Sequence, residues 1–370
     1  MKKIVIISMA TYPSQTPRGF RTHELSTELA RLGFKVNLYV LDGGFDYSNY
    51  CCANNLSIKS LGKTRLFKYN HEKDVQLNFL GRILKKFFKN IIEFPYIELA
   101  FKAFKTLKKE KDIDLLITIG APHPIHWGAA MYKKIHTERF KNTRWIADCG
   151  DPYMGNSFHK KLFYFKYIEK FFFRKADAVT IPLEKARSAY YSEFHSKIHI
   201  IPQGFNFDNI NIVDKKENNK TITFIYAGIF YPNLRDPRPF LDYLATCNYD
   251  FKFFVYTKTK DILKDYEEKL MGKLFINDYI PRSKLIFEMS KADFILNLEN
   301  ITDVQSPSKL IDYALSKTPI LSLNTNIPLD ISIINEFMEG NYSRKLVINN
   351  LEDYNIKNVV KSFLELSTKL

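Results

Sequence analysis

A strand–helix–strand pattern opens the chain and restricts the folds available to it. Residues 4–7 are a short apolar run, residues 20–32 carry leucines at helical spacing, and residues 35–41 form a second apolar run. Gly33 follows the helical stretch, as glycine commonly does where a helix ends. Two neighbouring strands joined through a helix run parallel, so the sequence predicts an α/β protein built on parallel sheets.

A second series of strands and helices begins near residue 221, and this predicts two domains. The chain has 370 residues, too many for one domain of ordinary size, and its 45% hydrophobic content is sufficient to fill two cores. We expect the first domain to span residues 1–206 and the second to span residues 221–351. The polar stretch 207–220 lacks a helical apolar stripe and is predicted to be the linker.

The positive charge is concentrated in the first half of the chain. Residues 1–203 hold 34 Lys and Arg against 18 Asp and Glu, whereas the remaining residues hold 21 against 22. Apolar and aromatic residues recur at helical spacing among lysines in residues 77–111 and again in residues 158–175. Such basic amphipathic helices can lie on an anionic membrane surface, or they can bury their apolar stripe in the core with the lysines in solvent. Both interpretations remain open at this point.

The four cysteines and the N-terminal segment suggest a compartment for the protein. The cysteines show no C-x-x-C spacing and predict free thiols in a reducing compartment. The apolar run after Lys2 and Lys3 is too short for a signal peptide or a membrane span. We therefore expect a cytoplasmic protein that at most contacts the inner face of the plasma membrane.

Residues 303–323 carry the clearest candidate for a binding site. Ser306 is a good N-cap and Pro307 suits the first helical position, so a helix is predicted to begin here with unpaired backbone N–H groups that attract anions. Lys309 lies in the first turn, where a cation opposes the helix dipole unless a phosphate is bound. Ser308 and Asp312 share one face, which places a carboxylate where ribose hydroxyls of a nucleotide would lie. An ordinary amphipathic helix with solvated Lys and Asp is the alternative.

The sequence PSKLIDYALSKTPIL at residues 307–321 resembles the donor-site motif of the retaining GT-B glycosyltransferases of family four. The resemblance implies that Ser308 and Lys309 hold the diphosphate of a sugar nucleotide and that Asp312 holds its ribose. Two positions depart from the motif: Val304 replaces a glutamate that contacts the sugar, and Lys317 replaces a turn glycine. The implied fold is GT-B, with two Rossmann-like parallel-sheet domains facing a cleft and a C-terminal helix, within 352–370, crossing back to the first domain.

The same resemblance assigns further residues of the second domain to the donor. Gly228 matches a glycine near the diphosphate, and either Arg235 or Arg238 matches a cation that neutralises the departing phosphates. Tyr279 and Ile280 lie in a turn whose backbone contacts the nucleobase in the family. The alternative is an exposed turn with solvated arginines.

In the first domain the resemblance implies an acceptor side and one catalytic histidine. The loop after the first strand, with Arg18, Gly19, Arg21 and His23, faces the acceptor in the family, although a solvated helix start is the alternative. The segment ADCGDPY resembles the family's D-x-R-D-P-W, with Gly150 in place of the arginine. The resemblance implies that its acidic residues, Asp148 and Asp151, belong to the acceptor side.

Two histidines follow another strand of the first domain, in the loop GAPHPIHWG. His123 matches a histidine near the reacting sugar, and a histidine satisfied by a nearby carbonyl is the alternative. A metal site at His123 and His126 is not expected, because no third ligand follows at a suitable spacing. The acidic pair Asp112 and Asp114 lies at the entry to a strand and is interpreted as structural.

The predicted function is transfer of a hexose-type sugar from a nucleotide-sugar donor to a lipid-linked or polysaccharide acceptor, with retention and without a metal or other cofactor. Lys309, Arg235 and His123 are the expected catalytic residues, and surface polysaccharide biosynthesis is the expected setting. The expected partners are the donor, the acceptor and an anionic membrane surface, with no nucleic acid. A GT-B sugar-nucleotide epimerase, a catalytically inactive relative and a non-enzymatic basic nucleic-acid-binding protein are the alternatives.

Overall fold

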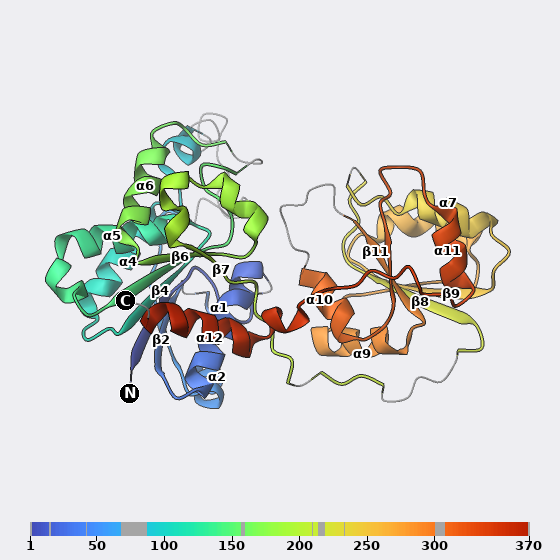
Figure 1. The fold of residues 1–370 in the computed structure, drawn as a ribbon, viewed down its shortest axis with the longest axis horizontal. Coiled ribbons are helices and arrows are strands. Elements are labelled where there is room, and N and C mark those ends of the chain that lie inside the picture. Colours follow the sequence, from blue (N-terminus) through green and yellow to red (C-terminus); the bar gives the residue numbers. More distant parts are fainter. Residues whose placement is uncertain are drawn as a thin grey trace. The chain divides into compact units, whose positions relative to one another are not determined.

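The computed structural model of the protein (Figure 1) describes residues 2–14, 16–41, 43–67, 87–156, 160–208, 210–213, 219–232, 234–299 and 308–368. The chain divides into two compact units. One contains Met1–Phe205 together with Asp353–Leu370, and the other contains Asn206–Glu352. In the described ranges no helix combines the length and the apolar character needed to cross a membrane.

The first unit is built on a parallel sheet of seven strands in the order β3-β2-β1-β4-β5-β6-β7. The strands are β1 Lys3–Ile7, β2 Lys35–Val40, β3 Ser57–Ser60, β4 Leu115–Gly120, β5 Arg144–Cys149, β6 Ala178–Ile181 and β7 Ile198–Ile200. In the central register Ile6 of β1 lies opposite Leu38 of β2 and Ile117 of β4. The predicted strand–helix–strand opening is therefore present as β1, α1 and β2.

Helices cover both faces of this sheet. Their bounds are α1 Pro17–Arg31, α2 Ser48–Asn54, α4 Glu98–Lys109, α5 Pro124–Ile135, α6 Phe165–Lys175 and α12 Ile356–Thr368. One core lies under α4, α5 and α6, and the other lies under α1 and α12. Short 3-10 helices occur at Thr137–Phe140, Glu184–Ala189 and Ser192–Lys197. The C-terminal helix α12 thus completes the first unit, as the predicted fold class requires.

Local sequence explains where helix α1 begins and ends. Thr16 caps it by accepting a hydrogen bond from the backbone N–H of Gly19 at 3.1 Å, and Pro17 occupies the first helical position. Gly33 follows the helix with φ of +87°, a conformation that glycine adopts without the Cβ clash other residues meet. The loop between β1 and α1 is thereby fixed at the carboxyl edge of the sheet.

Helix α6 begins later than the sequence predicted. The aromatic and basic stretch suggested a helix from residue 158, but the described residues are helical only from Phe165. Leu162 and Phe163 are exposed, whereas Phe165, Phe172 and Phe173 are buried. The helix starts where its apolar residues begin to pack on the sheet, because burial of an apolar face supplies most helical stability in proteins.

Close packing of α4 on α5 depends on Gly128. A Cβ at this position would lie 2.1 Å from the backbone oxygen of Ala100, an atom that no rotamer change can move away. We expect Gly128→Ala to lower the melting temperature, because the overpacking costs about 1–3 kcal/mol or more, which outweighs the roughly 1 kcal/mol that alanine gains in helix propensity. Gly43→Ala is the matched control, since a Cβ at Gly43 meets no atom within 4 Å. A melting temperature that Gly128→Ala leaves unchanged or raises would contradict this packing.

The second unit contains a parallel sheet of five strands in the order β10-β9-β8-β11-β12. The strands are β8 Ile222–Ala227, β9 Phe251–Tyr256, β10 Leu274–Asn277, β11 Phe294–Leu298 and β12 Ile320–Leu323. The helices are α7 Arg238–Thr246, α8 Lys264–Lys269, α9 Arg282–Lys291, α10 Ser308–Leu315 and α11 Ile331–Met338, with 3-10 helices at Lys260–Leu263 and Leu351–Tyr354. One core packs under α7, α8 and α11, and a smaller one under α9 and α10. Ligands of open α/β sheets bind at the carboxyl edge of the strands, so the candidate site of this unit is expected at that edge.

Candidate functional site

In the second unit, two cations lie at the carboxyl edge of β8 and β11. Lys309 is in the first turn of α10, and its ammonium Nζ lies 3.5 Å from the carbonyl oxygen of Leu298, the last residue of β11. The same Nζ lies 5.4 Å from the ring centre of Tyr226 in β8. Burial, and then the neighbouring Arg235 guanidinium, lower the pKa of Lys309 to about 7. The structure therefore places Lys309 and Arg235 close together.

Neither cation has an ion-pair partner among the described residues. The guanidinium of Arg235 lies over the ring of Tyr231 at 4.9 Å, and its buried Nε atom has no hydrogen-bond partner in those ranges. Two adjacent positive groups without a counterion disfavour each other's charged form, and an anion bound between them would remove that conflict. The pair Lys309 and Arg235 is therefore a candidate anion site of the second unit.

Arg235 and Arg238 were alternatives in the sequence, and the structure distinguishes them. The guanidinium of Arg238 is bonded to both carboxylate oxygens of Asp236, at 2.9 and 3.0 Å from its Nε atom. The Asp236 carboxylate raises the pKa of Arg238 further. Since Arg238 already has its counterion, Arg235 is the arginine available to an anion beside Lys309.

Helix α10 is anchored so that its first turn stays at the sheet edge. The hydroxyl of Tyr313 donates a 2.8 Å hydrogen bond to the carbonyl of Ala227, the last residue of β8. Gly228 follows with φ of +152°, a backbone conformation in which side chains are strained. The predicted ligands Ser306 and Pro307 lie outside the described residues. Ser308 begins α10 and brings the free N–H groups of a helix start to this edge.

Asp312 is not isolated, and sequence reasoning missed its partner. Arg282, the first residue of α9, contacts Oδ1 of Asp312 through Nε at 2.7 Å and through Nη2 at 2.7 Å. Burial nevertheless raises the pKa of Asp312, against the lowering effect of that arginine. Arg282 lies two residues after Ile280 of the predicted nucleobase turn, but nothing in the sequence indicates that it reaches α10. Tyr279 of that turn is exposed with the Lys258 ammonium over its ring, and Ile280 is half-buried.

In the first unit, Arg21 and Asp148 form a buried ion pair, which corrects their predicted placement facing the acceptor. Their side chains are 3% and 1% exposed, and Nη2 of Arg21 lies 2.7 Å from Oδ1 of Asp148. Arg21 also donates to the carbonyls of Ile201 and Pro202, and Thr180 donates to Asp148 at 2.7 Å. The two side chains are thus hydrogen-bonded to each other and to neighbouring buried groups. The pair therefore positions α1 against β5 and against the residues that follow β7.

Arg18 occupies the space that Gly150 leaves open. A Cβ at Gly150 would lie 1.7 Å from the guanidinium carbon of Arg18. The motif that this segment resembles has an arginine where the chain has Gly150. In this protein the guanidinium of Arg18, from the first turn of α1, lies against the backbone at that position. Glycine in place of the motif arginine was the sequence signal for this arrangement. The neighbouring Gly19 is buried, and Arg18 itself is half-buried.

His23 belongs to a partly exposed aromatic group beside this loop. Its Nδ1 is hydrogen-bonded to the Tyr50 hydroxyl, and burial lowers the pKa of His23. Tyr12 stacks on Tyr50 with ring centres 5.1 Å apart, and Phe45 meets Tyr12 edge-on. Of the predicted acceptor-side set, Arg18, His23 and Asp151 are thus the residues that remain partly exposed near the carboxyl edge of the first sheet.

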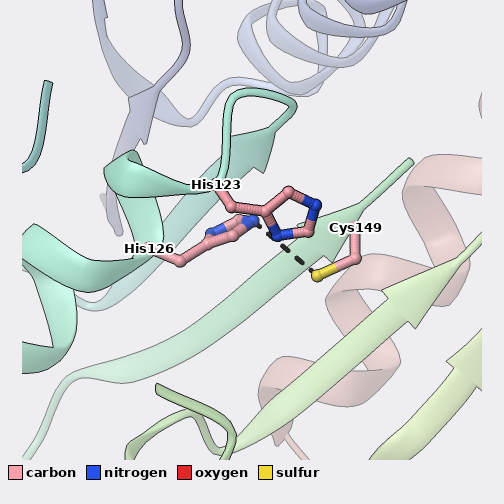
Figure 2. A group of neighbouring side chains, drawn as sticks. All are labelled: His123, His126 and Cys149. Atoms are coloured by element: carbon pink, nitrogen blue, oxygen red, sulfur yellow. Dashed lines mark hydrogen bonds between the residues drawn. The ribbon is translucent and has the colours of Figure 1, made fainter. Parts of the chain in front are cut away.

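His123 is buried beneath the loop that follows β5 and lies beside His126 and Cys149 (Figure 2). Its Nε2 lies 3.1 Å from the carbonyl of Asp151, and since a carbonyl can only accept, Nε2 carries the proton. Burial is the main cause that lowers the pKa of His123 to about 4, so the imidazole is neutral at pH 7. Asp151 therefore contributes its backbone here. Contact between His123 and a sugar stays a prediction.

No protein-family model matches the sequence, and no curated protein matches it. The fold is similar to solved structures. A glycosyltransferase from Rickettsia africae ESF-5 has a TM-score of 0.67 at 11% identity, covering 99% of this chain and 97% of that one. HepE of Anabaena with UDP and glucose has a TM-score of 0.62 at 9% identity, covering all of both chains. The lipopolysaccharide outer core galactosyltransferase WaaB has a TM-score of 0.58 at 12% identity, covering 98% of each chain. The chain therefore has the predicted GT-B fold of two parallel-sheet α/β domains.

Proposed function

We propose that the protein is a glycosyltransferase whose second unit binds a nucleotide sugar. The observation that carries this proposal is the pair Lys309 and Arg235, two adjacent cations with no ion-pair partner in the described residues, at the carboxyl edge of a parallel sheet. A diphosphate supplies the negative charge that this pair lacks, and guanidinium binds phosphate oxygens bidentately. Support also comes from the fold, since the solved structure of HepE, whose fold is similar, is a complex with UDP and glucose.

This placement of the diphosphate determines which residues we propose to contact the rest of the nucleotide. The N–H groups at the start of α10 and the glycine backbone at Gly228 would approach the phosphates. The carboxylate of Asp312, held by Arg282, would accept hydrogen bonds from the ribose hydroxyls. Tyr279 and Ile280 would lie beside the base. Each of these roles rests on the proposed position of the diphosphate beside Lys309.

The proposed reaction moves a hexose from the diphosphate to an acceptor hydroxyl. The bond between the anomeric carbon and the phosphate oxygen breaks, the hydroxyl oxygen bonds to that carbon, and the hydroxyl proton is released. Negative charge that develops on the departing phosphate would be stabilised by Lys309 and Arg235, so the chain's own cations supply the role a catalytic metal has elsewhere. We propose retention of anomeric configuration and membership of family four on the motif at residues 307–321.

The acceptor is proposed to be lipid-linked or a polysaccharide and to bind the first unit near Arg18 and His23. The aromatic group of Tyr12, Phe45 and Tyr50 offers apolar ring faces next to hydroxyls, which suits a partly apolar, hydroxyl-rich ligand. WaaB, with a similar fold, is a lipopolysaccharide galactosyltransferase, which supports surface polysaccharide biosynthesis as the setting. The proposed location is the cytoplasm, with contact at the inner face of the plasma membrane.

Membrane contact is proposed through an aromatic surface of the first unit, defined by Phe87, Phe88, Ile92, Leu162, Phe163 and Tyr167. These side chains are exposed, Phe163 at 73%. The two segments that carry them are joined by the ion pair of Lys161 with Glu93 and by the hydrogen bond from the Tyr164 hydroxyl to the Ile91 carbonyl. The ammonium of Lys166 lies over the Tyr167 ring. Exposed aromatics among lysines suit a bilayer with anionic headgroups.

Substituting both Phe88 and Phe163 by serine is expected to weaken binding to vesicles containing anionic phospholipid by at least about tenfold, because each ring contributes about 1.5–3 kcal/mol on burial. Co-sedimentation with vesicles measures the effect. Met271→Ser in the second unit is the control, since Met271 is 79% exposed but far in sequence from the aromatic surface. Equal binding of the two variants, or no binding of the native protein, would contradict the proposed contact.

A thermal-shift panel of UDP-, GDP-, ADP- and dTDP-sugars tests the proposed function. We expect one nucleotide family to raise the melting temperature with a saturable concentration dependence, since a ligand that binds only the folded state stabilises it. Incubation of that donor without an acceptor then separates the alternatives, because an epimerase would release an altered sugar nucleotide. No shift with any donor, together with salt-dependent binding of single-stranded nucleic acid, would refute the proposal.

A further inference from the structure

Three metal-binding side chains converge in the first unit although they are separated in the sequence. His123 lies just before α5, His126 lies in its first turn, and Cys149 ends the neighbouring strand β5. One ligand atom of each residue lies within 4.8 Å of those of the other two (Figure 2). The three residues are 5%, 0% and 0% exposed. No third ligand follows the histidines at a suitable spacing in the sequence, and the pairing of β4 with β5 brings Cys149 to them.

The orientation of His126 is fixed by a second layer of hydrogen bonds. Its Nδ1 lies 2.7 Å from Oγ1 of Thr118, and Trp145 donates its Nε1–H to the same oxygen at 2.9 Å. Its Nε2 therefore faces Sγ of Cys149, 3.7 Å away. Gly120 makes room for the ring, because a Cβ at that position would lie 2.5 Å from Nε2. Ligating histidines are characteristically held in this way by a partner on the second ring nitrogen.

The Nδ1 atom of His123 is available as a metal ligand. Its Nε2–H is bonded to the Asp151 carbonyl, which leaves Nδ1 with a lone pair. That buried Nδ1 has no hydrogen-bond partner in the described ranges, and it is directed toward the contact of His126 with Cys149 (Figure 2). A buried acceptor without a donor is unfavourable. A structural hydrogen bond between Cys149 and His126 alone would not account for this nitrogen.

The chemistry of the three groups selects a thiophilic cation. Burial lowers the pKa of both imidazoles, so both are neutral and keep their lone pairs at pH 7. Burial raises the pKa of the Cys149 thiol, so metal binding must displace its proton to solvent. Two imidazoles and one thiolate suit Zn²⁺ or Cu⁺ and are poor ligands for Mg²⁺ or Ca²⁺. With Cu⁺ the site is electrically neutral, whereas Zn²⁺ leaves one positive charge and an open fourth position.

We propose that His123 Nδ1, His126 Nε2 and Cys149 Sγ form a structural site for one thiophilic ion, Zn²⁺ or Cu⁺. The ion joins the β4–α5 loop to the end of β5 and thereby fixes the carboxyl edge of the first sheet. This site lies in the first unit, whereas the donor is proposed to bind the second unit. A protein without the metal could still bind a nucleotide sugar.

Metal content of tag-free protein tests the proposal. The chain has four cysteines, so the triple variant Cys51→Ser/Cys52→Ser/Cys247→Ser keeps Cys149 as its sole thiol. Because the site is buried, native protein, this variant and Cys149→Ser are unfolded and refolded without oxygen in the presence of Zn²⁺, Cu⁺ or Co²⁺, and dialysed. We expect about one ion per chain in the native protein and the triple variant, by elemental mass spectrometry, and close to none in Cys149→Ser.

The Co²⁺ form identifies the ligand and covers the case in which Cys149→Ser does not fold. A sulfur-to-cobalt charge-transfer band in the triple variant can come only from Cys149. Retention of Zn²⁺ or of Cu⁺ decides which ion the site takes, and either supports the proposal. Less than about 0.1 ion per refolded native chain with every metal, or equal metal content in Cys149→Ser, would overturn it.

Discussion

Lys309→Met is expected to weaken binding of the nucleotide sugar by about 10- to 100-fold, since a hydrogen bond to a charged group is worth about 1.5–3 kcal/mol. Transfer is expected to fall by about 100- to 1,000-fold, because the ammonium opposes charge that grows on the departing phosphate. Methionine keeps much of the apolar length of the lysine stem between Tyr226 and Tyr313. Removing a half-buried cation whose pKa is already lowered to about 7 should not destabilise the fold.

This combination separates a binding role from a structural one. Calorimetry with the donor identified in the thermal-shift panel gives the affinity, and the melting temperature without ligand gives the stability. Lys284→Met on α9 is the control, because Lys284 is exposed. Native-like donor affinity in Lys309→Met would refute the assignment, and a large fall in its melting temperature would make Lys309 a structural residue.

Arg21→Met is expected to lower the free energy of unfolding of the first unit by about 3–5 kcal/mol, because it leaves a buried carboxylate without its counterion. Asp148 is 1% exposed, and Thr180 would remain as its hydrogen-bond donor. The double variant Arg21→Met/Asp148→Leu is expected to recover a large part of the loss, since a hydrophobic pair of similar volume can replace a buried ion pair.

Chemical denaturation of both variants measures the effect, and an exposed ion pair provides the comparison. Arg187 and Glu184 are 2.5 Å apart on the surface of the same unit, so Glu184→Gln is expected to leave the denaturation midpoint unchanged. If Arg21→Met were as stable as the native protein, Arg21 and Asp148 would not form the buried network described here, and their predicted acceptor role would regain support.

Features set by local sequence were predictable. Alternation of short apolar runs with amphipathic helices identified two parallel sheets, and Thr16, Pro17 and Gly33 mark the ends of α1 by chemistry that requires no tertiary information. The motif at residues 307–321 placed Lys309 and Asp312 on one helix. Lys317, which replaces the turn glycine of the motif, adopts a positive φ of +58°, so the turn keeps a backbone conformation typical of glycine.

Features that depend on pairing between distant segments were not predictable. Arg21 follows the polar pattern of an exposed helix start, yet it is buried because Asp148, 127 residues away, lies opposite it. Cys149 reaches His126 only through the register of β4 with β5, in which Gly120 lies opposite Cys149. Spacing along one chain carries no information on such contacts.

The central claim is that a diphosphate binds beside Lys309, and proton uptake during binding tests it most directly. In the free protein the Lys309 pKa is about 7, so at pH 8 the side chain is mostly neutral, and a bound diphosphate raises that pKa and restores the charge. Calorimetric titration of the native protein with the preferred nucleotide sugar at pH 8, in two buffers of different ionisation enthalpy, should show uptake of nearly one proton. Below about pH 6 the uptake should vanish, and affinity should fall as the pH rises above about 7. Binding at pH 8 without proton uptake, and with an affinity independent of pH, would contradict the account.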